Sequence, residues 1–473
     1  MGKDSAILAL VVSLLVSIAY EDGATNVAST PTPFGQRVPN AVANLPEGAL
    51  IVQDESPIGY PRFFALGRQG AEQIGKGPSI SVSPDGRALA AVEWDSDYSR
   101  WRIRLLSVDG EEQAVIELAP APTAVNAGIP YLLWSADGER LAYTVADEDQ
   151  TDKSQVYVVD SDGSGQRRVT SAPDYYSPIG WTSEGRLLIS APGRLLLGGE
   201  RTEEMPLPAN LAQGGSTLSP DGTKAAIQAG DYEEGLELWL LDLDTQALRL
   251  LADMGGNVRT AAEDLYVFAG VPPVARARST DLLLKGPPPV IWSPDSSRIA
   301  YLRSLVGPSS AVSSELRVVD VGSGEDILIT EEGGWLPAWS PDRRYLVAPT
   351  ETSMLLRDSQ GQTRNFDMPY ALKQATWSSS GTLVAITAAG IRLIDPETAA
   401  ERSAVAGDGK PVYGGNAAYG QWVWSPSGRY LAFSTISDQY TKGSVYMLDS
   451  NSGTATLVLD RQAFVPVGWL AGD

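Results

Sequence analysis

Carboxylates and aromatic rings are the side chains of this sequence whose types and spacing could do chemistry. Asp95 and Asp97 form one acidic run, and Asp147, Asp149 and Asp152 form another, with oxygen ligands of the kind that calcium prefers. Neither run has the glycine and terminal glutamate of an EF-hand loop. We therefore assign no metal and no cofactor to this chain.

Histidine and cysteine are both absent from the sequence. Their absence excludes disulfides, thiol nucleophiles, Ser-His-Asp triads and metal sites built on imidazole or thiolate. The 473 residues carry a formal net charge of -22, which repels the phosphate backbone of nucleic acids. We predict that the protein is not an enzyme, assign no catalytic residue, and expect no nucleic-acid partner.

The elements that would position the candidate side chains follow an N-terminal leader. Lys3 precedes an apolar run over residues 6–20, in which Ser17 and Ala19 are small residues suited to a cleavage site. This pattern predicts a signal peptide over residues 1–19, with an uncleaved membrane anchor as the alternative. Residues 20–48 are rich in Pro, Ser and Thr without apolar periodicity and predict a flexible tether. We expect a location outside the cytoplasm: periplasmic, at the cell surface or secreted.

A repeated phrase organises residues 49–473. It consists of an apolar strand ending in Trp-Ser or a close variant, a Pro-Asp-Gly-like turn, and a second apolar strand. Its eight copies start at Val82, Trp134, Trp181, Leu218, Trp292, Trp339, Trp377 and Trp424. Most of the intervals, counted between the Ser or Thr residues, lie near the length of one four-stranded propeller blade.

The phrase predicts a β-hairpin because Pro presets φ, Asp bonds back to the backbone, and Gly accepts positive φ. A third strand that ends in Asp recurs, as at Asp160, Asp320, Asp395 and Asp449, and a short fourth strand completes each unit. The Asp residues of the phrase are interpreted as scaffold, and the Trp residues as filling between neighbouring blades.

These units predict an all-β fold: one β-propeller of four-stranded antiparallel blades over residues 49–473, with an insertion at about 252–290. The insertion could be a lid over the central channel or a degenerate blade. Residues 464–469 read as a first strand without partners, and residues 49–74 as strands two to four without a first, so the two ends should share one blade. The literal count is nine. We expect eight blades, with the unit at Thr182 irregular, and seven as a further alternative.

The phrases resemble the WD-type repeats of the TolB-like propeller family, and those of the propeller in dipeptidyl-peptidase-like enzymes. The copies at Trp292, Trp339 and Trp424 follow that motif well. The resemblance implies an extracytoplasmic interaction module. It does not extend to a hydrolase, because the sequence contains no nucleophile elbow and no histidine.

Two rims follow from such a fold. The turns after the first and third strands form one rim, here named the turn rim. The second-to-third and fourth-to-first connections form the other, named the loop rim, which is the more variable, acidic and aromatic of the two. The candidate binding residues are predicted from the loop rim: Tyr98, Trp101, Asp149, Tyr175, Tyr176, Tyr232, Trp335, Tyr370 and Tyr440.

Aromatic faces beside carboxylates could hold a basic peptide or stack on sugars. We expect a non-catalytic monomer that binds a protein or a cell-wall component through the loop rim, and that meets a membrane only through an uncleaved leader. A carbohydrate-active enzyme, of the glycoside hydrolase or lyase type, that uses carboxylates and tyrosines is the alternative. A purely structural subunit of an envelope complex is a third.

Overall fold

The fold consists of short antiparallel strands. The computed structural model describes Leu45 and residues 48–54, 61–67, 70–94, 100–108, 110–120, 129–147, 153–207, 211–231, 235–255, 290–306, 312–331, 337–350, 353–368, 372–387, 390–406, 422–436, 443–459 and 464–471. Residues Met1–Gln36 form one unit and Arg37–Asp473 another, and every described residue belongs to the second. The predicted signal peptide and nearly all of the predicted tether lie outside the described residues, as do residues 256–289 of the predicted insertion.

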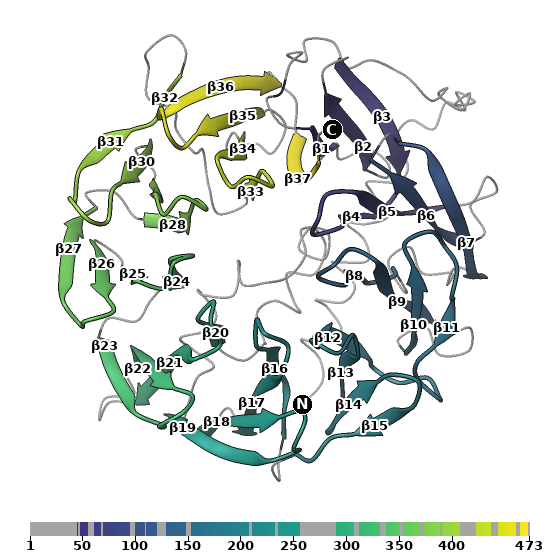
Figure 1. The fold of residues 1–473 in the computed structure, drawn as a ribbon, viewed down its shortest axis with the longest axis horizontal. Coiled ribbons are helices and arrows are strands. Elements are labelled where there is room, and N and C mark those ends of the chain that lie inside the picture. Colours follow the sequence, from purple (N-terminus) through teal and green to yellow (C-terminus); the bar gives the residue numbers. More distant parts are fainter. Residues whose placement is uncertain are drawn as a thin grey trace, which may run out of the picture. The chain divides into compact units, whose positions relative to one another are not determined.

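Within the described residues, 37 strands form nine sheets (Figure 1). Eight sheets have four antiparallel strands, and the ninth has four antiparallel strands and the short additional strand β32. The first four blades are β37 (Phe464–Leu470), β1 (Ala49–Asp54), β2 (Arg62–Gly67), β3 (Gly70–Lys76); β4 (Ser79–Val82), β5 (Ala88–Trp94), β6 (Arg100–Ser107), β7 (Glu112–Pro120); β8 (Leu132–Trp134), β9 (Arg140–Ala146), β10 (Ser154–Asp160), β11 (Arg167–Arg168); and β12 (Ser177–Trp181), β13 (Leu187–Ala191), β14 (Arg194–Gly198), β15 (Thr202–Glu204).

Blades 5 to 9 continue in chain order. They are β16 (Leu211–Leu218), β17 (Lys224–Asp231), β18 (Gly235–Asp242), β19 (Leu248–Gly255); β20 (Val290–Trp292), β21 (Arg298–Val306), β22 (Val312–Asp320), β23 (Asp326–Thr330); β24 (Ala338–Trp339), β25 (Tyr345–Pro349), β26 (Ser353–Asp358), β27 (Thr363–Asp367); β28 (Leu372–Trp377), β29 (Leu383–Thr387), β30 (Gly390–Ile394), β31 (Glu401–Ser403); and β33 (Trp422–Trp424), β34 (Tyr430–Ile436), β35 (Gly443–Asp449), β36 (Thr454–Leu459), with β32 (Val405–Ala406) parallel to β36.

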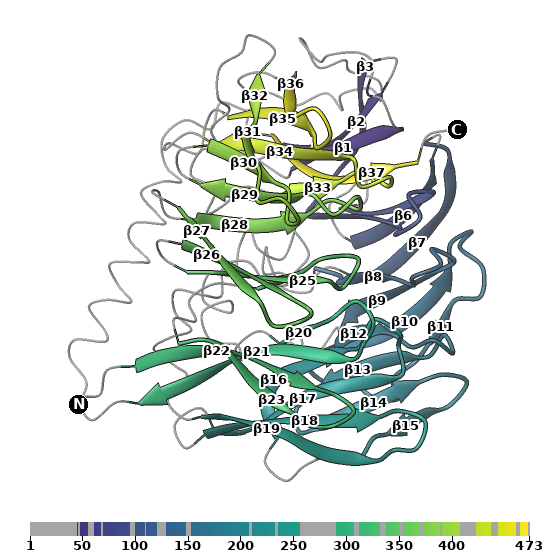
Figure 2. The ribbon, with the colours of Figure 1, turned by 60° about the vertical axis from the view of Figure 1, so that its left-hand side comes forward.

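The two ends of this unit share blade 1, as predicted. Strand β37 pairs antiparallel with β1, from Ala49 opposite Leu470 to Asp54 opposite Phe464. Strand β37 also contacts β33 of blade 9 and β4 of blade 2, so the ring closes through it. In Figures 1 and 2, successive sheets follow the chain around this ring.

The described residues form nine blades, so the expectation of eight is wrong and the literal repeat count of nine is right. The unit at Thr182, which we expected to be irregular, is the complete blade 4. Its repeat is short because its middle strands have five residues each, and only Pro192 and Gly193 separate them.

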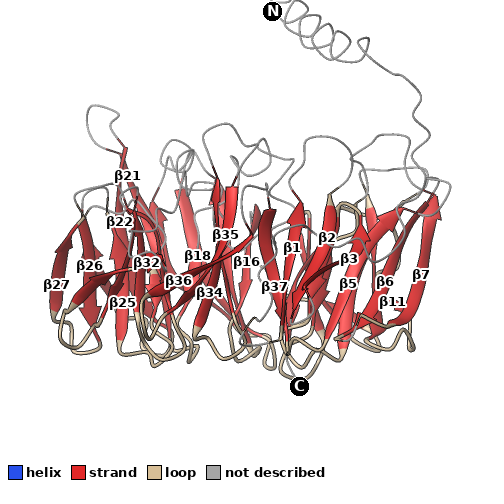
Figure 3. Ribbon diagram, turned by 90° about the horizontal axis from the view of Figure 1, so that it is seen from above, coloured by secondary structure: helices blue, strands red, loops and turns tan. Residues whose placement is uncertain are grey.

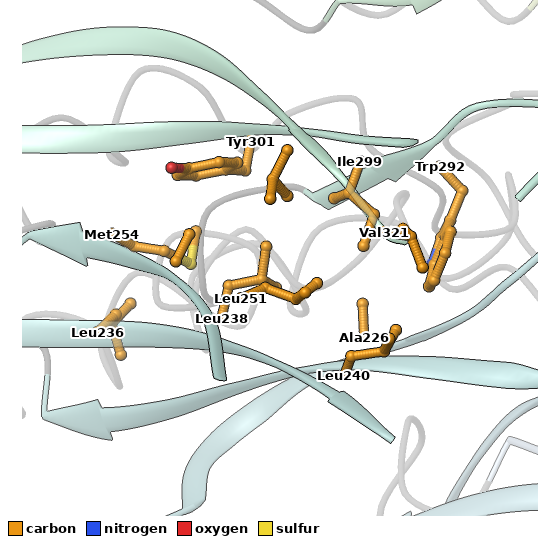
Figure 4. Close-up of a cluster of buried hydrophobic side chains, with 12 residues drawn as sticks. Ala226, Leu236, Leu238, Leu240, Leu251, Met254, Trp292, Ile299, Tyr301 and Val321 are labelled. Atoms are coloured by element: carbon orange, nitrogen blue, oxygen red, sulfur yellow. The ribbon is translucent and has the colours of Figure 1, made fainter. Parts of the chain in front are cut away.

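The buried apolar side chains of the described residues form nine clusters, each shared by two neighbouring blades. Figure 4 shows the one in which Leu238 and Met254 of blade 5 pack against Trp292 and Tyr301 of blade 6. Because the two faces of a sheet belong to different clusters, no blade can bury its apolar surface alone.

In seven of the nine blades, the repeat tryptophan joins the blade to the one before it. Trp181 Nε1 donates to Leu133 O at 3.2 Å, and Trp377 Nε1 donates to Ala338 O at 3.1 Å. Equivalent bonds lead from five others: Trp134, Trp292, Trp339, Trp424 and Trp469. The predicted role of these residues between blades is confirmed.

Candidate functional site

The turn rim is built from repeat turns whose carboxylates bond within the turn (tan along one edge of the ring in Figure 3). In blade 6, Ser293 Oγ donates to Asp295 Oδ1 at 2.7 Å, and the same oxygen accepts the backbone N–H of Ser297 at 3.2 Å. The backbone N–H of Arg298 donates to Ser293 Oγ at 2.9 Å. The same three bonds recur in blades 2, 3, 5 and 7.

In four of these five blades the bonds lower the pKa of the repeat carboxylate. Partial burial by itself would raise the pKa of Asp295, but hydrogen bonds from Ser293 and Ser297 outweigh it and lower the pKa to about 2. The hydrogen bond from Ser135 likewise lowers the pKa of Asp137. A carboxylate held ionised in this way accepts hydrogen bonds but cannot serve as a general acid at neutral pH. The interpretation of these residues as scaffold agrees with this geometry.

A second set of carboxylates ends the third strands. Asp320 Oδ1 accepts the backbone N–H groups of Ser323 at 2.8 Å and of Gly322 at 3.0 Å, which lowers the pKa of Asp320. Backbone N–H groups of the turn likewise lower the pKa of Asp242 and Asp395. The pKa of Asp449 is lowered chiefly by the hydrogen bond from the Arg429 side chain, and also by the backbone N–H of Asn451. These residues also belong to the turns of the turn rim.

Only part of the predicted loop-rim site lies within the described residues. Trp101, Tyr175 and Tyr176 do. The other candidates lie outside them: Tyr98, Asp149, Tyr232, Trp335, Tyr370 and Tyr440.

Trp101 and Tyr176 are core residues. Trp101 is 3 % exposed and packs in the cluster between blades 2 and 3, and Tyr176 is 9 % exposed and packs between blades 3 and 4. Their side chains are therefore not presented on a surface, and this part of the expected aromatic rim is corrected. The sequence placed both in loops or at strand ends, where burial by the neighbouring blade leaves no local pattern.

Tyr175 is the exposed aromatic residue of the described loop rim, at 51 % exposure. The preceding residue, Asp174, pairs by its backbone with Ser154 of β10, with N–O distances of 2.9 and 3.1 Å. The Asp174 carboxylate forms an ion pair with Arg194 of β14 and accepts the N–H of Tyr175 at 2.9 Å. Tyr175 thus stands on backbone fixed to blades 3 and 4.

The structure also shows a cavity on the turn rim that our sequence analysis did not predict. It lies between blades 6 and 7 and has a volume of about 200 Å³. Its charged lining residues are four arginines, Arg298, Arg343, Arg344 and Arg357, and three acidic residues, Asp320, Glu325 and Asp358; the rest of the lining includes apolar side chains. A signal in the sequence existed: Arg343 stands where most copies of the phrase have glycine, and it adopts a positive φ of 66°.

Within the described residues, no group of three or more acidic side chains is placed to hold a metal ion. Of the two acidic runs considered for calcium, only Asp147 is described. The described part of the chain also lacks any helix with the length and apolarity needed to cross a bilayer.

Comparison with solved structures supports the fold. The structure is similar to that of a eukaryotic initiation factor, with a TM-score of 0.54 and 10% identity over 89% of this chain and 98% of that one. It is also similar to TolB from Acinetobacter baumannii (TM-score 0.31, 13% identity, 80% and 82% covered) and to dipeptidyl peptidase 4 of Porphyromonas gingivalis (0.49, 10%, 81% and 59%). No family model and no curated protein matches the sequence.

The chain is a β-propeller, and TolB and a dipeptidyl peptidase are among the structures similar to it, as the repeat phrase predicted. At these identities the likeness concerns the fold alone. A shared fold does not determine function, which depends on the side chains of the binding or active site.

Proposed function

We propose that this protein is a non-catalytic propeller outside the cytoplasm, and that it binds a protein or a cell-envelope component through its loop rim. Tyr175 carries the proposal, since it is 51 % exposed on backbone that two neighbouring blades hold in place. A rigid exposed tyrosine loses little conformational entropy on binding and supplies both a ring face and a hydroxyl, as hot-spot residues do.

The chemistry of the described carboxylates favours binding over catalysis. The repeat aspartates with a resolved shift have lowered pKa values, whereas a catalytic acid needs a raised one. The sequence has neither histidine nor cysteine to take the role of a base or nucleophile.

The net charge of -22 supports a neutral or basic partner. The location outside the cytoplasm rests on the apolar run over residues 6–20, preceded by Lys3.

The test is capture of partners from the native envelope with the full-length chain and with Tyr175→Ala. Loss of a hot-spot tyrosine typically costs about 2 kcal/mol or more, so captured partner should fall at least about tenfold. Leu250→Ala is the matched control, because Leu250 is 47 % exposed on the outer strand β19, away from the rim connections.

Equal capture by the wild-type and Tyr175→Ala proteins would contradict the assignment of the site. The carbohydrate-active alternative is tested separately with envelope polysaccharides. Release of reducing ends or of unsaturated sugars by the purified chain would overturn the non-catalytic proposal.

A further inference from the structure

Arginines of the fourth strands fasten several blades to the next one. Arg364 of β27 donates from Nη1 to the backbone carbonyls of Pro396 at 3.0 Å and Glu397 at 2.8 Å, in the turn between β30 and β31. Arg402 Nη2 donates a hydrogen bond to Ser450 O at 2.6 Å, and Arg167 Nη1 donates one to Gly199 O at 2.7 Å. Arg249 donates to Val321 O. We name this arrangement the arginine clasp.

Strand pairing shows which residue takes the clasp position in blade 6. In blade 7, Leu356 lies two residues before Asp358 and is paired with Arg364. In blade 6, Val318 lies two residues before Asp320 and is paired with Ile327. Ile327 therefore stands where the clasp arginine stands in the four other blades, and its side chain is 37 % exposed.

The turn that a clasp would reach, between β26 and β27, contains Ser359 and Gln360. Among the described residues, neither carbonyl accepts a backbone or side-chain hydrogen bond. Both residues line the cavity of about 200 Å³ between blades 6 and 7. The cluster that joins these blades also has six buried members, the fewest of the nine clusters in the described part of the chain.

Two of the arginines in the cavity wall have carboxylate partners. Arg343 Nη1 lies 3.5 Å from Asp295 Oδ2. Arg344 Nε lies 2.6 Å from Asp342 Oδ2, and Arg344 Nη1 lies 2.6 Å from Glu397 Oε1.

The other two arginines that line the cavity, Arg298 and Arg357, have no bonded carboxylate partner. Within the described residues, their guanidinium groups form no hydrogen bond and no ion pair, although both residues are partly buried. The charge of Arg298 contributes to the low pKa of Asp320 opposite it, whose Oδ1 is bonded within its own turn. A partly desolvated guanidinium without a bonded anion favours a carboxylate, which it can bind with two parallel hydrogen bonds.

We propose that this cavity binds the C-terminal residue of a peptide that ends in an apolar side chain. Arg298 and Arg357 receive the terminal carboxylate, the carbonyls of Ser359 and Gln360 accept the N–H of the terminal residue, and the side chain lies on Ile327 and the apolar residues beside it.

The size of the cavity supports one residue rather than a larger ligand. Its apolar lining residues are Val318, Ile327, Ile329, Trp339 and Leu346. Pockets for drug-sized ligands usually enclose about 300–1,000 Å³, whereas this one encloses about 200 Å³. The site lies on the turn rim, so it is separate from the loop-rim site proposed above.

The test is calorimetric titration of the full-length chain with a pentapeptide ending in Ala-Leu, as the free acid and as the C-terminal amide. The acid should bind, and the amide should bind at least about tenfold more weakly, because it lacks the charge that the guanidinium groups receive. Arg298→Gln and Arg357→Gln should each weaken the binding of the free-acid peptide by a similar factor. Arg87→Gln is the control, since Arg87 is an exposed arginine on the turn of blade 2.

Ile327→Arg separates binding from folding. The new arginine would complete the clasp between blades 6 and 7, so the melting temperature should be unchanged or raised while peptide binding is lost. Equal binding of acid and amide, or full binding by Ile327→Arg, would overturn the proposal. N-acetyl-leucine distinguishes the source of the carboxylate: if it binds as tightly as the pentapeptide, the site takes a small carboxylate and the peptide assignment is wrong.

Discussion

At the scale of single residues, the serine hydroxyl of the repeat phrase and the carboxylate two residues later act as a pair. In five blades the hydroxyl donates to the carboxylate, at 2.5 to 2.7 Å. In four of these blades the bond lowers the pKa of the carboxylate, at Asp137, Asp221, Asp295 and Asp342, and the bond is lost on unfolding. The folded protein therefore holds fewer protons on these four residues than the unfolded chain does near pH 3.

We predict that the protein loses stability as the pH falls below about 5. A lowered pKa contributes stability that is fully present above the unfolded value of about 3.9 and disappears as the pH falls through the folded value, which is about 2 for Asp295. Melting temperatures followed by circular dichroism from pH 7 to pH 2.5 measure this.

Asp295→Asn should lower the melting temperature at pH 7 and make its decline below pH 4 shallower. Glu184→Gln is the matched control, because Glu184 takes the aspartate position in blade 4 and forms no hydrogen bond among the described residues. A decline that is the same in Asp295→Asn and wild type would contradict the assignment.

At the scale of elements, the first strands are fitted to one another around the ring. Where the phrase has an aliphatic residue in place of Trp, the preceding blade has glycine at the facing position. A Cβ on Gly468 would lie 2.6 Å from Val82 Cγ2, and one on Gly180 would lie 2.9 Å from Leu218 Cδ2. The small and large residues of neighbouring first strands are therefore complementary.

We predict that Gly468→Ala destabilises the fold by about 1–3 kcal/mol, the usual cost of an added buried methyl group. Gly180→Ala should cost less, because the terminal methyl of Leu218 can rotate away whereas branched Val82 cannot. Urea unfolding of both variants gives the comparison.

The double variant Gly468→Ala with Val82→Ala identifies the cause. It should recover part of the loss, with a coupling energy of about 0.5 kcal/mol or more. Strictly additive effects would show that the close approach to Val82 is not the source of the destabilisation.

At the scale of the whole molecule, stability depends on closing the ring through β37. Four large side chains of this strand are buried: Phe464, Val465, Trp469 and Leu470. Burial of such side chains contributes roughly 1.5–3 kcal/mol each, or about 6–12 kcal/mol together. That sum is comparable to the entire folding free energy of a typical domain, about 5–15 kcal/mol.

We predict that removal of residues 464–473 leaves a chain that does not fold cooperatively, because the two clusters beside blade 1 lose buried members and β1 gains an open edge. Loss of the cooperative thermal transition measures this. A synthetic peptide of residues 460–473 added in excess should restore the transition. A truncated chain that melts like the wild type would contradict the latch.

The sequence by itself determined the all-β repeat, the role of the Trp and Asp residues in the phrase, and the blade shared by both ends. These features are local or periodic, because turns, strand alternation and repeats are written in short stretches of chain. It did not determine the blade number we chose, since a short repeat can be a complete blade, as blade 4 is.

The tertiary structure alone decided which side chains are available for binding. Trp101 and Tyr176 are buried because each packs in a cluster shared with a neighbouring blade, whereas Tyr175 is exposed. The exposure of such a side chain therefore depends on residues of another blade. The same holds for Ile327, which became meaningful only when strand pairing placed it where other blades have a clasp arginine. Contacts between residues far apart in the chain leave no spacing that a single sequence can show.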